Sequence, residues 1–249
     1  MQLTETTHGG GDGPPLVIAH GLFGSARNWG AIAKRLSDTR RVISVDTRKH
    51  GDSPRAETQS YPDMAGDIGG ALTEPSDLLG HSMGGKAAMV LALTQPAHLR
   101  KLVIADIAPV AYSHTQAHLI AAMRNIDLNR VETRGDADRQ LAAEVAEPGV
   151  RAFLLQSLDV KARTWRINLD VLDREMDKIL GFPDIGGQFE GPTLFLTGAE
   201  SDYVERAHRD RIRALFPNAR FASLPGAGHW LHADKPREFE AAVRVFLDS

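Results

Sequence analysis

The chain contains no cysteine among its 249 residues. Disulfide bonds, a thiolate nucleophile and cysteine-ligated metals are therefore excluded, so packing alone must hold the fold together. A chain without cysteine suits a reducing compartment, and we expect a cytoplasmic protein.

Long apolar runs and a surplus of positive charge are absent as well. No stretch approaches the roughly 18 apolar residues of a membrane-spanning helix. The first residues, Met1–Thr7, lack the basic start and the apolar stretch of a signal peptide. Lys and Arg number 29 against 32 Asp and Glu, which gives a net charge of −3. We therefore expect neither a membrane nor nucleic acid as a partner.

Short apolar, β-branched runs alternate with helix-forming stretches along the chain. The runs are Leu16–Ala19, Val42–Val45, Leu102–Ala105 and Leu194–Leu196, and the helices are expected at Trp29–Leu36, Pro62–Leu72, Gly84–Leu93 and Pro236–Leu247. Runs that are apolar on both faces indicate buried parallel strands. We predict one α/β domain over residues 1–249, a monomer or homodimer, with a mostly parallel, doubly wound sheet. Segment 8–15, rich in glycine and proline, is predicted to be a loop.

Between residues 110 and 190 the pattern changes to helices without obvious strands. The helices are expected at Ser113–Ile126, Asp136–Ala146, Gly149–Leu158 and Asn168–Leu180. Such an insertion between two late strands should fold over the strand ends as a cap. A cap would narrow and dry a site at that edge of the sheet.

The pentapeptide Gly80–Gly84 reads G-H-S-M-G and joins an apolar run to a strong helix-former. A strand that turns abruptly into a helix strains the residue at the apex and leaves no room for side chains two positions away. The turn would present the hydroxyl of Ser82 above the sheet, at the positive end of the following helix. Ser82 is therefore the candidate nucleophile for acyl transfer.

A serine needs a base and an orienting acid. For the base we favour His229, which lies in a glycine turn near the end of the chain, over its neighbour His232. Asp106 and Asp202 each follow a predicted strand, and either gives the order Ser, Asp, His. The sequence leaves both open as the acid.

The developing oxyanion needs hydrogen-bond donors, and an acyl chain needs apolar walls. The amides of Met83, at the helix start, and Leu22, in the glycine-rich turn after the first buried strand, are the candidate donors. Phe23, Tyr112 and Trp230, with Met83, are expected to line an apolar pocket.

Metal and cofactor chemistry finds little support in the sequence. His114 and His118 have i, i+4 spacing and would share one helix face. No third ligand converges on them, so we expect no metal and no cofactor.

Five blocks of residues resemble the α/β-hydrolase superfamily, and within it a branch of small esterases related to the abhydrolase-11 type. The blocks are His20–Ser25, Asp46–Pro54, Gly80–Lys86, Asp106–Val110 and Gly228–Pro236. The likeness spans nearly the whole chain, including the helical insertion.

The resemblance implies an α/β-hydrolase fold and a serine hydrolase that cleaves small-molecule carboxylic esters with short to medium acyl chains. It carries over Ser82 as nucleophile, His229 as base, and the amides of Leu22 and Met83 as oxyanion donors. Some members of the branch place the acid at the position of Asp106, whereas the wider superfamily more often uses that of Asp202. Because the block Asp106–Val110 matches the branch closely, the resemblance favours Asp106 as the acid, with Asp202 as the alternative. A thioesterase, a C–C bond hydrolase and a non-catalytic small-molecule receptor remain alternatives, because each reuses this constellation.

Overall fold

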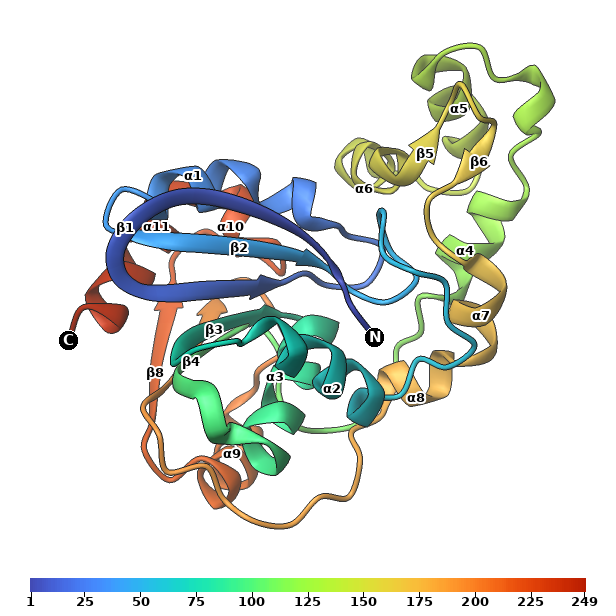
Figure 1. The fold of residues 1–249 in the computed structure, drawn as a ribbon. Coiled ribbons are helices and arrows are strands. Elements are labelled where there is room, and N and C mark those ends of the chain that lie inside the picture. Colours follow the sequence, from blue (N-terminus) through green and yellow to red (C-terminus); the bar gives the residue numbers. More distant parts are fainter.

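The computed structural model describes all 249 residues, and a six-stranded sheet runs through its centre (Figure 1). The strands are β1 (Thr4–Ala19), β2 (Arg40–Asp46), β3 (Ser76–His81), β4 (Leu99–Ala105), β7 (Thr193–Gly198) and β8 (Ala219–Leu224). Their order is β2-β1-β3-β4-β7-β8, and all pairs from β1 to β8 are parallel. The predicted mostly parallel sheet is confirmed, and the carboxyl ends of its strands meet at one edge.

Strand β1 doubles back around β2. Thr4–His8 pairs antiparallel with β2, whereas Leu16–Ala19 pairs with Val42–Val45 in ascending register, so β2 lies between the two halves. Figure 1 shows the strand curving round the start of β2. Segment 8–15, predicted to be a loop, is part of this strand. That prediction was wrong because the chain bends at Gly9, whose φ is 71°, and pairs with β2 again from Asp12 after a shift in register.

Helices cover both faces of the sheet, as a doubly wound fold requires (Figure 1). One face carries α1 (Gly30–Leu36), α10 (Leu231–Asp234) and α11 (Pro236–Leu247), and the other carries α2 (Tyr61–Ala71), α3 (Met83–Thr94) and α9 (Arg209–Leu215). The two cores divide each strand between them: Ile18 and Val103 pack with the first set, and Val17 and Ile104 with the second.

No helix combines the length and apolar character needed to cross a bilayer.

The helical insertion, residues 110–190, connects β4 to β7 and stands beyond one edge of the sheet (Figure 1). Its helices are α4 (Ala117–Arg124), α5 (Arg134–Leu141), α6 (Pro148–Leu154), α7 (Leu169–Arg174) and α8 (Met176–Leu180). The single helix predicted at its end is divided at Glu175. Two short strands, β5 (Leu158–Asp159) and β6 (Thr164–Trp165), form a hairpin that the sequence did not reveal, because two residues are too few to show alternation.

The turn from β3 to α3 brings backbones into direct contact. A Cβ atom added to Gly80 would lie 2.5 Å from the carbonyl oxygen of Gly84. One added to Gly84 would lie 2.5 Å from the carbonyl oxygens of Ala19 and His20. Backbone atoms cannot swing away as a side chain can, so both positions require glycine.

We expect Gly84→Ala to lower the free energy of unfolding by about 1–3 kcal/mol or more, because the added methyl group overpacks the turn. Gly66→Ala is the matched control: this glycine lies inside α2 with no atom near its Cβ position. That change should raise stability by about 0.5–1 kcal/mol. Urea unfolding of both variants checks this, and equal stabilities would contradict the tight packing at Gly84.

Candidate active site

Ser82 occupies the apex of the turn between β3 and α3. Its φ of 51° and ψ of −121° lie outside the regions that a residue with a side chain normally adopts. The amide of Ser82 donates to the carbonyl of Ala105 at 3.1 Å, which ties the apex to the end of β4. Helix α3 begins at the next residue, so its positive end lies beside the hydroxyl.

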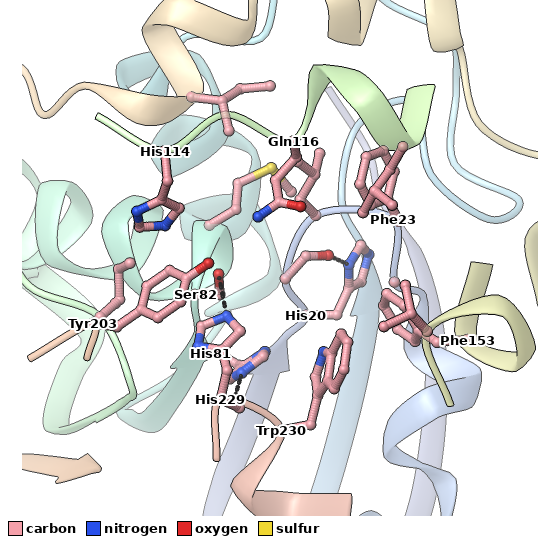
Figure 2. A pocket seen from close by; sticks show the side chains of 18 of the residues that line it. His20, Phe23, His81, Ser82, His114, Gln116, Phe153, Tyr203, His229 and Trp230 are labelled. Atoms are coloured by element: carbon pink, nitrogen blue, oxygen red, sulfur yellow. Dashed lines mark hydrogen bonds between the residues drawn. The ribbon is translucent and has the colours of Figure 1, made fainter. Parts of the chain in front are cut away.

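Ser82, His229 and Asp106 form one continuous hydrogen-bonded chain. The imidazole Nε2 of His229 lies 3.1 Å from the hydroxyl oxygen of Ser82 (Figure 2). Its Nδ1 lies 2.8 Å from Oδ2 of Asp106 and donates to it, because a carboxylate only accepts. Nε2 is then left free to accept the serine proton.

The structure separates the two candidate acids. Asp106 is fully buried, and its carboxylate also accepts hydrogen bonds from the amide of Gly198, at 3.0 Å, and from the hydroxyl of Ser201. Asp202 is exposed, and its carboxylate makes no hydrogen bond to His229. The last residue of β7 and the loop after it therefore supply donors to Asp106.

Two side chains that sequence reasoning did not assign hold His229 in place. The ring of Tyr203 stacks on the imidazole at a centroid distance of 3.8 Å and an angle of 17° (Figure 2). His81 donates from Nε2 to the backbone carbonyl of His229 at 2.9 Å. His81 stands inside the serine pentapeptide, which was a usable signal, whereas nothing in the sequence marked Tyr203 or Ser201.

The loop after β1 lies directly against the nucleophile. A Cβ atom on Gly21 would come within 3.1 Å of that of Ser82. The amide of Leu22 donates to no group of the protein, and that of Met83, at the first position of α3, has no acceptor within the helix. His20 fixes the loop, since its Nε2 accepts from the amide of Thr47 at 3.0 Å. Both predicted oxyanion donors are thus unoccupied beside Ser82.

A cavity of about 540 Å³ opens above Ser82 and His229. All of the predicted lining residues, Phe23, Met83, Tyr112 and Trp230, border it. The helical insertion adds a further apolar wall made of Leu119, Val145, Val150, Phe153, Ile179 and Leu180. Phe153 meets Trp230 at a centroid distance of 5.4 Å (Figure 2). The cavity therefore suits an apolar chain.

Polar residues of the insertion, among them Glu144 and Glu147, also line the cavity and are exposed, whereas Lys86 is its only Lys or Arg. His114 and His118 line it too, and the ring of His114 packs against that of Tyr203 at 4.9 Å. No group of three or more His, Cys, Asp or Glu side chains is placed to hold a metal ion.

Comparison with known proteins places the chain in a family. A sequence profile of the α/β hydrolase fold family matches residues 14–236. The chain is 45% identical to the sn-1-specific diacylglycerol lipase ABHD11 of Mus musculus, over 94% of this chain and 81% of that protein. It is 39% identical to esterase YbfF of Escherichia coli (strain K12), over 94% and 93%. A solved marine microorganism esterase superposes with a TM-score of 0.93 at 37% identity, over 98% of this chain and 99% of that one.

The chain therefore belongs to the α/β-hydrolase family, in the small-esterase branch that its motif blocks resemble. The identity to proteins named as esterases and lipases makes it a carboxylic ester hydrolase. The predictions of fold, family and enzyme class are confirmed.

Buried histidines around the site make the folded state sensitive to acid. Burial lowers the pKa of His20 from 6.5 to about 4, and lowers the pKa values of His50 and His232 to about 3. Below pH 6.5 the unfolded chain therefore binds protons that the folded chain does not bind. Above pH 6.5 these histidines are neutral in both states and do not affect the free energy of unfolding. As the pH falls from 6.5 toward 3, the free energy of unfolding decreases progressively.

We expect the free energy of unfolding to fall between pH 7 and pH 5, by at most about 1.4 kcal/mol per pH unit for each such histidine. His232→Phe removes one of these groups and keeps a ring against Trp29, on which His232 stacks at 4.1 Å. The stability of this variant, measured by urea titration, should depend less steeply on pH. Identical slopes for variant and wild type would show that His232 does not titrate in this way.

Proposed function

We propose that the ester hydrolase acts through an acyl-enzyme on Ser82, with His229 as general base and Asp106 as the orienting acid. The observation that carries this is the unbroken chain of hydrogen bonds from the Ser82 hydroxyl through His229 to Asp106, at 3.1 and 2.8 Å, on the wall of a cavity. The burial and additional donors of Asp106 favour it over Asp202 for this role.

In the first step, Oγ of Ser82 bonds to the ester carbonyl carbon while Nε2 of His229 takes the hydroxyl proton. The carbonyl oxygen becomes an oxyanion, which accepts hydrogen bonds from the amides of Leu22 and Met83. His229 then gives its proton to the departing alcohol. In the second step His229 removes a proton from water, the hydroxide attacks the acyl carbon, and the acid leaves as Ser82 regains its proton.

We propose that the substrate is an uncharged ester with a short to medium acyl chain. The apolar cavity supports this, as do relatives named as a diacylglycerol lipase and an esterase. A thioester on a phosphate-bearing carrier is disfavoured, because Glu144 and Glu147 line the cavity on its exposed side and no Arg does.

The helical insertion acts as a cap in this proposal. It contributes Val150 and Phe153 to the cavity wall, and Gln156 accepts a hydrogen bond from Asn28 of the core at 2.5 Å. Covering the site in this way excludes water and strengthens the hydrogen bonds to the oxyanion.

Ser82→Ala should lower kcat for p-nitrophenyl esters by about 10⁴–10⁶-fold, because the nucleophile is lost. Its thermal unfolding should stay cooperative, which shows that the variant is folded. Undiminished turnover by the folded variant would refute the mechanism, and turnover absent from the wild type itself would favour a non-catalytic receptor.

Asp106→Asn should lower kcat by about 10⁴-fold, because an amide no longer stabilises the imidazolium or fixes its tautomer. Asp202→Asn is the matched control at the other strand end. Its kcat should remain close to that of the wild type, because the carboxylate of Asp202 makes no hydrogen bond to His229. Steady-state kinetics on one ester decides between them: a large loss confined to Asp202→Asn would assign the acid to the loop after β7.

A further inference from the structure

Lys86 is a buried lysine on α3, one turn beyond Ser82, and it borders the cavity. The residue is only 1% exposed, and its ammonium group forms no ion pair with a carboxylate. Instead Nζ donates to the carbonyl oxygens of Leu180, at 2.7 Å, and Gly181, at 2.6 Å. The mechanism proposed above leaves this residue without a role.

The two carbonyls lie at the end of the last helix of the insertion, α8. Leu180 is the last residue of α8, so neither the Leu180 nor the Gly181 carbonyl accepts a hydrogen bond from an amide of the helix. The hydroxyl of Tyr61 donates to the preceding carbonyl, that of Ile179, at 2.6 Å. Three successive carbonyls at this helix end are therefore bound by side chains of the core.

The start of the insertion is held at the same place. The amide of Tyr112 donates to the carbonyl of Leu180 at 3.0 Å, and its ring centroid lies 4.6 Å from Nζ of Lys86. The ring centroid of Tyr61, which belongs to α2, lies 5.7 Å from Nζ of Lys86. The start of the insertion and the end of its last helix thus meet around one ammonium group.

A lysine in this position is costly, because burying a cation without a counter-charge is unfavourable. Burial lowers the pKa of Lys86 to about 7. The neutral amine would still carry two hydrogens, which match the two carbonyls. A methionine would fill similar space without the cost but could not bond to either carbonyl.

We propose that Lys86 is a positioning residue that fixes the end of the insertion on the nucleophile's helix and thereby sets the acyl-chain selectivity of the enzyme. The wall it holds consists of Ile179 and Leu180, which line the cavity. Lys86 lies four residues beyond Ser82, about 6 Å along the helix axis. We therefore expect a hexanoyl chain to reach this wall and an acetyl group to end short of it. The inference rests on the proposed function of Ser82.

The chain offers a matched control in Lys101 of β4. Its Nζ donates to the carbonyls of Phe246, at 3.2 Å, and Leu247, at 2.9 Å, at the end of α11. The ring of Phe246 lies 5.8 Å from Nζ. Lys101 also donates to the backbone oxygen of Ser249, at 2.5 Å. It thus binds carbonyls at a helix end as Lys86 does, with one bond more, but it does not border the cavity.

The experiment compares Lys86→Met and Lys101→Met with the wild type on p-nitrophenyl hexanoate and acetate. For Lys86→Met the ratio of kcat/KM for hexanoate to that for acetate should fall about tenfold, the discrimination that a methylene contact gives. The loss should lie mainly in KM for hexanoate. Lys101→Met should keep the wild-type ratio, whatever its effect on the melting temperature.

Hydrogen exchange gives a second readout that needs no turnover. Peptides covering residues 110–116 and 176–192 should exchange faster in Lys86→Met than in Lys101→Met. Tyr61→Phe, which removes the bond to Ile179 and keeps the ring, should change the ratio in the same direction by a smaller factor. It replaces Lys86→Met if that variant does not fold.

An unchanged ratio in folded Lys86→Met, or an equal change in Lys101→Met, would overturn the proposal. Unaltered exchange at both segments would overturn it as well. A wild type without esterase turnover would instead refute the proposed function, and the exchange data would still decide whether Lys86 holds the insertion.

Discussion

The structure depends on one close approach, in which the backbone at Gly84 packs against the carbonyls of Ala19 and His20. Only glycine permits it, and only this approach lets β3 turn into α3 with Ser82 raised at the apex. The same contact brings the loop after β1 beside the serine, where the amide of Leu22 is free. The positions of the proposed nucleophile and of the proposed oxyanion donors thus follow from a single packing constraint.

Strain in the backbone concentrates around this point. Phe23, Ser82 and Asp106 all have positive φ, between 51° and 63°, and each follows the end of a parallel strand. Such conformations cost about 1–3 kcal/mol each and persist only where the surroundings enforce them. Here the enforcement is visible for Asp106, whose amide donates to Leu196 at 2.9 Å and whose carboxylate accepts three hydrogen bonds. This backbone strain is the cost of orienting side chains that an unstrained turn would direct elsewhere.

Much of this architecture could be predicted from the sequence, because apolar runs and glycine turns report strands, helices and their order. Ser82 and His229 could be chosen because each stands in a distinctive glycine turn, and the structure places them in contact. The proposed acid could not be chosen from the residues alone, since Asp106 and Asp202 follow neighbouring strands and differ in where their side chains point. Ser201 and Tyr203 could not be predicted for a related reason. Ser201 donates a hydrogen bond to Asp106 and Tyr203 stacks on the imidazole of His229, and neither contact has a sequence signature.

The hydrogen bond from Tyr112 to Leu180 joins the two ends of the segment that carries α4 to α8, and this has a consequence for how such enzymes diversify. A segment whose ends adjoin can be lengthened, shortened or exchanged without moving the strands it interrupts. Its contribution to the cavity would change, while Ser82, His229 and Asp106, which all lie outside it, would keep their geometry. The insertion is in this sense a replaceable module, and new substrate ranges can evolve on it while the chemistry beneath is inherited intact.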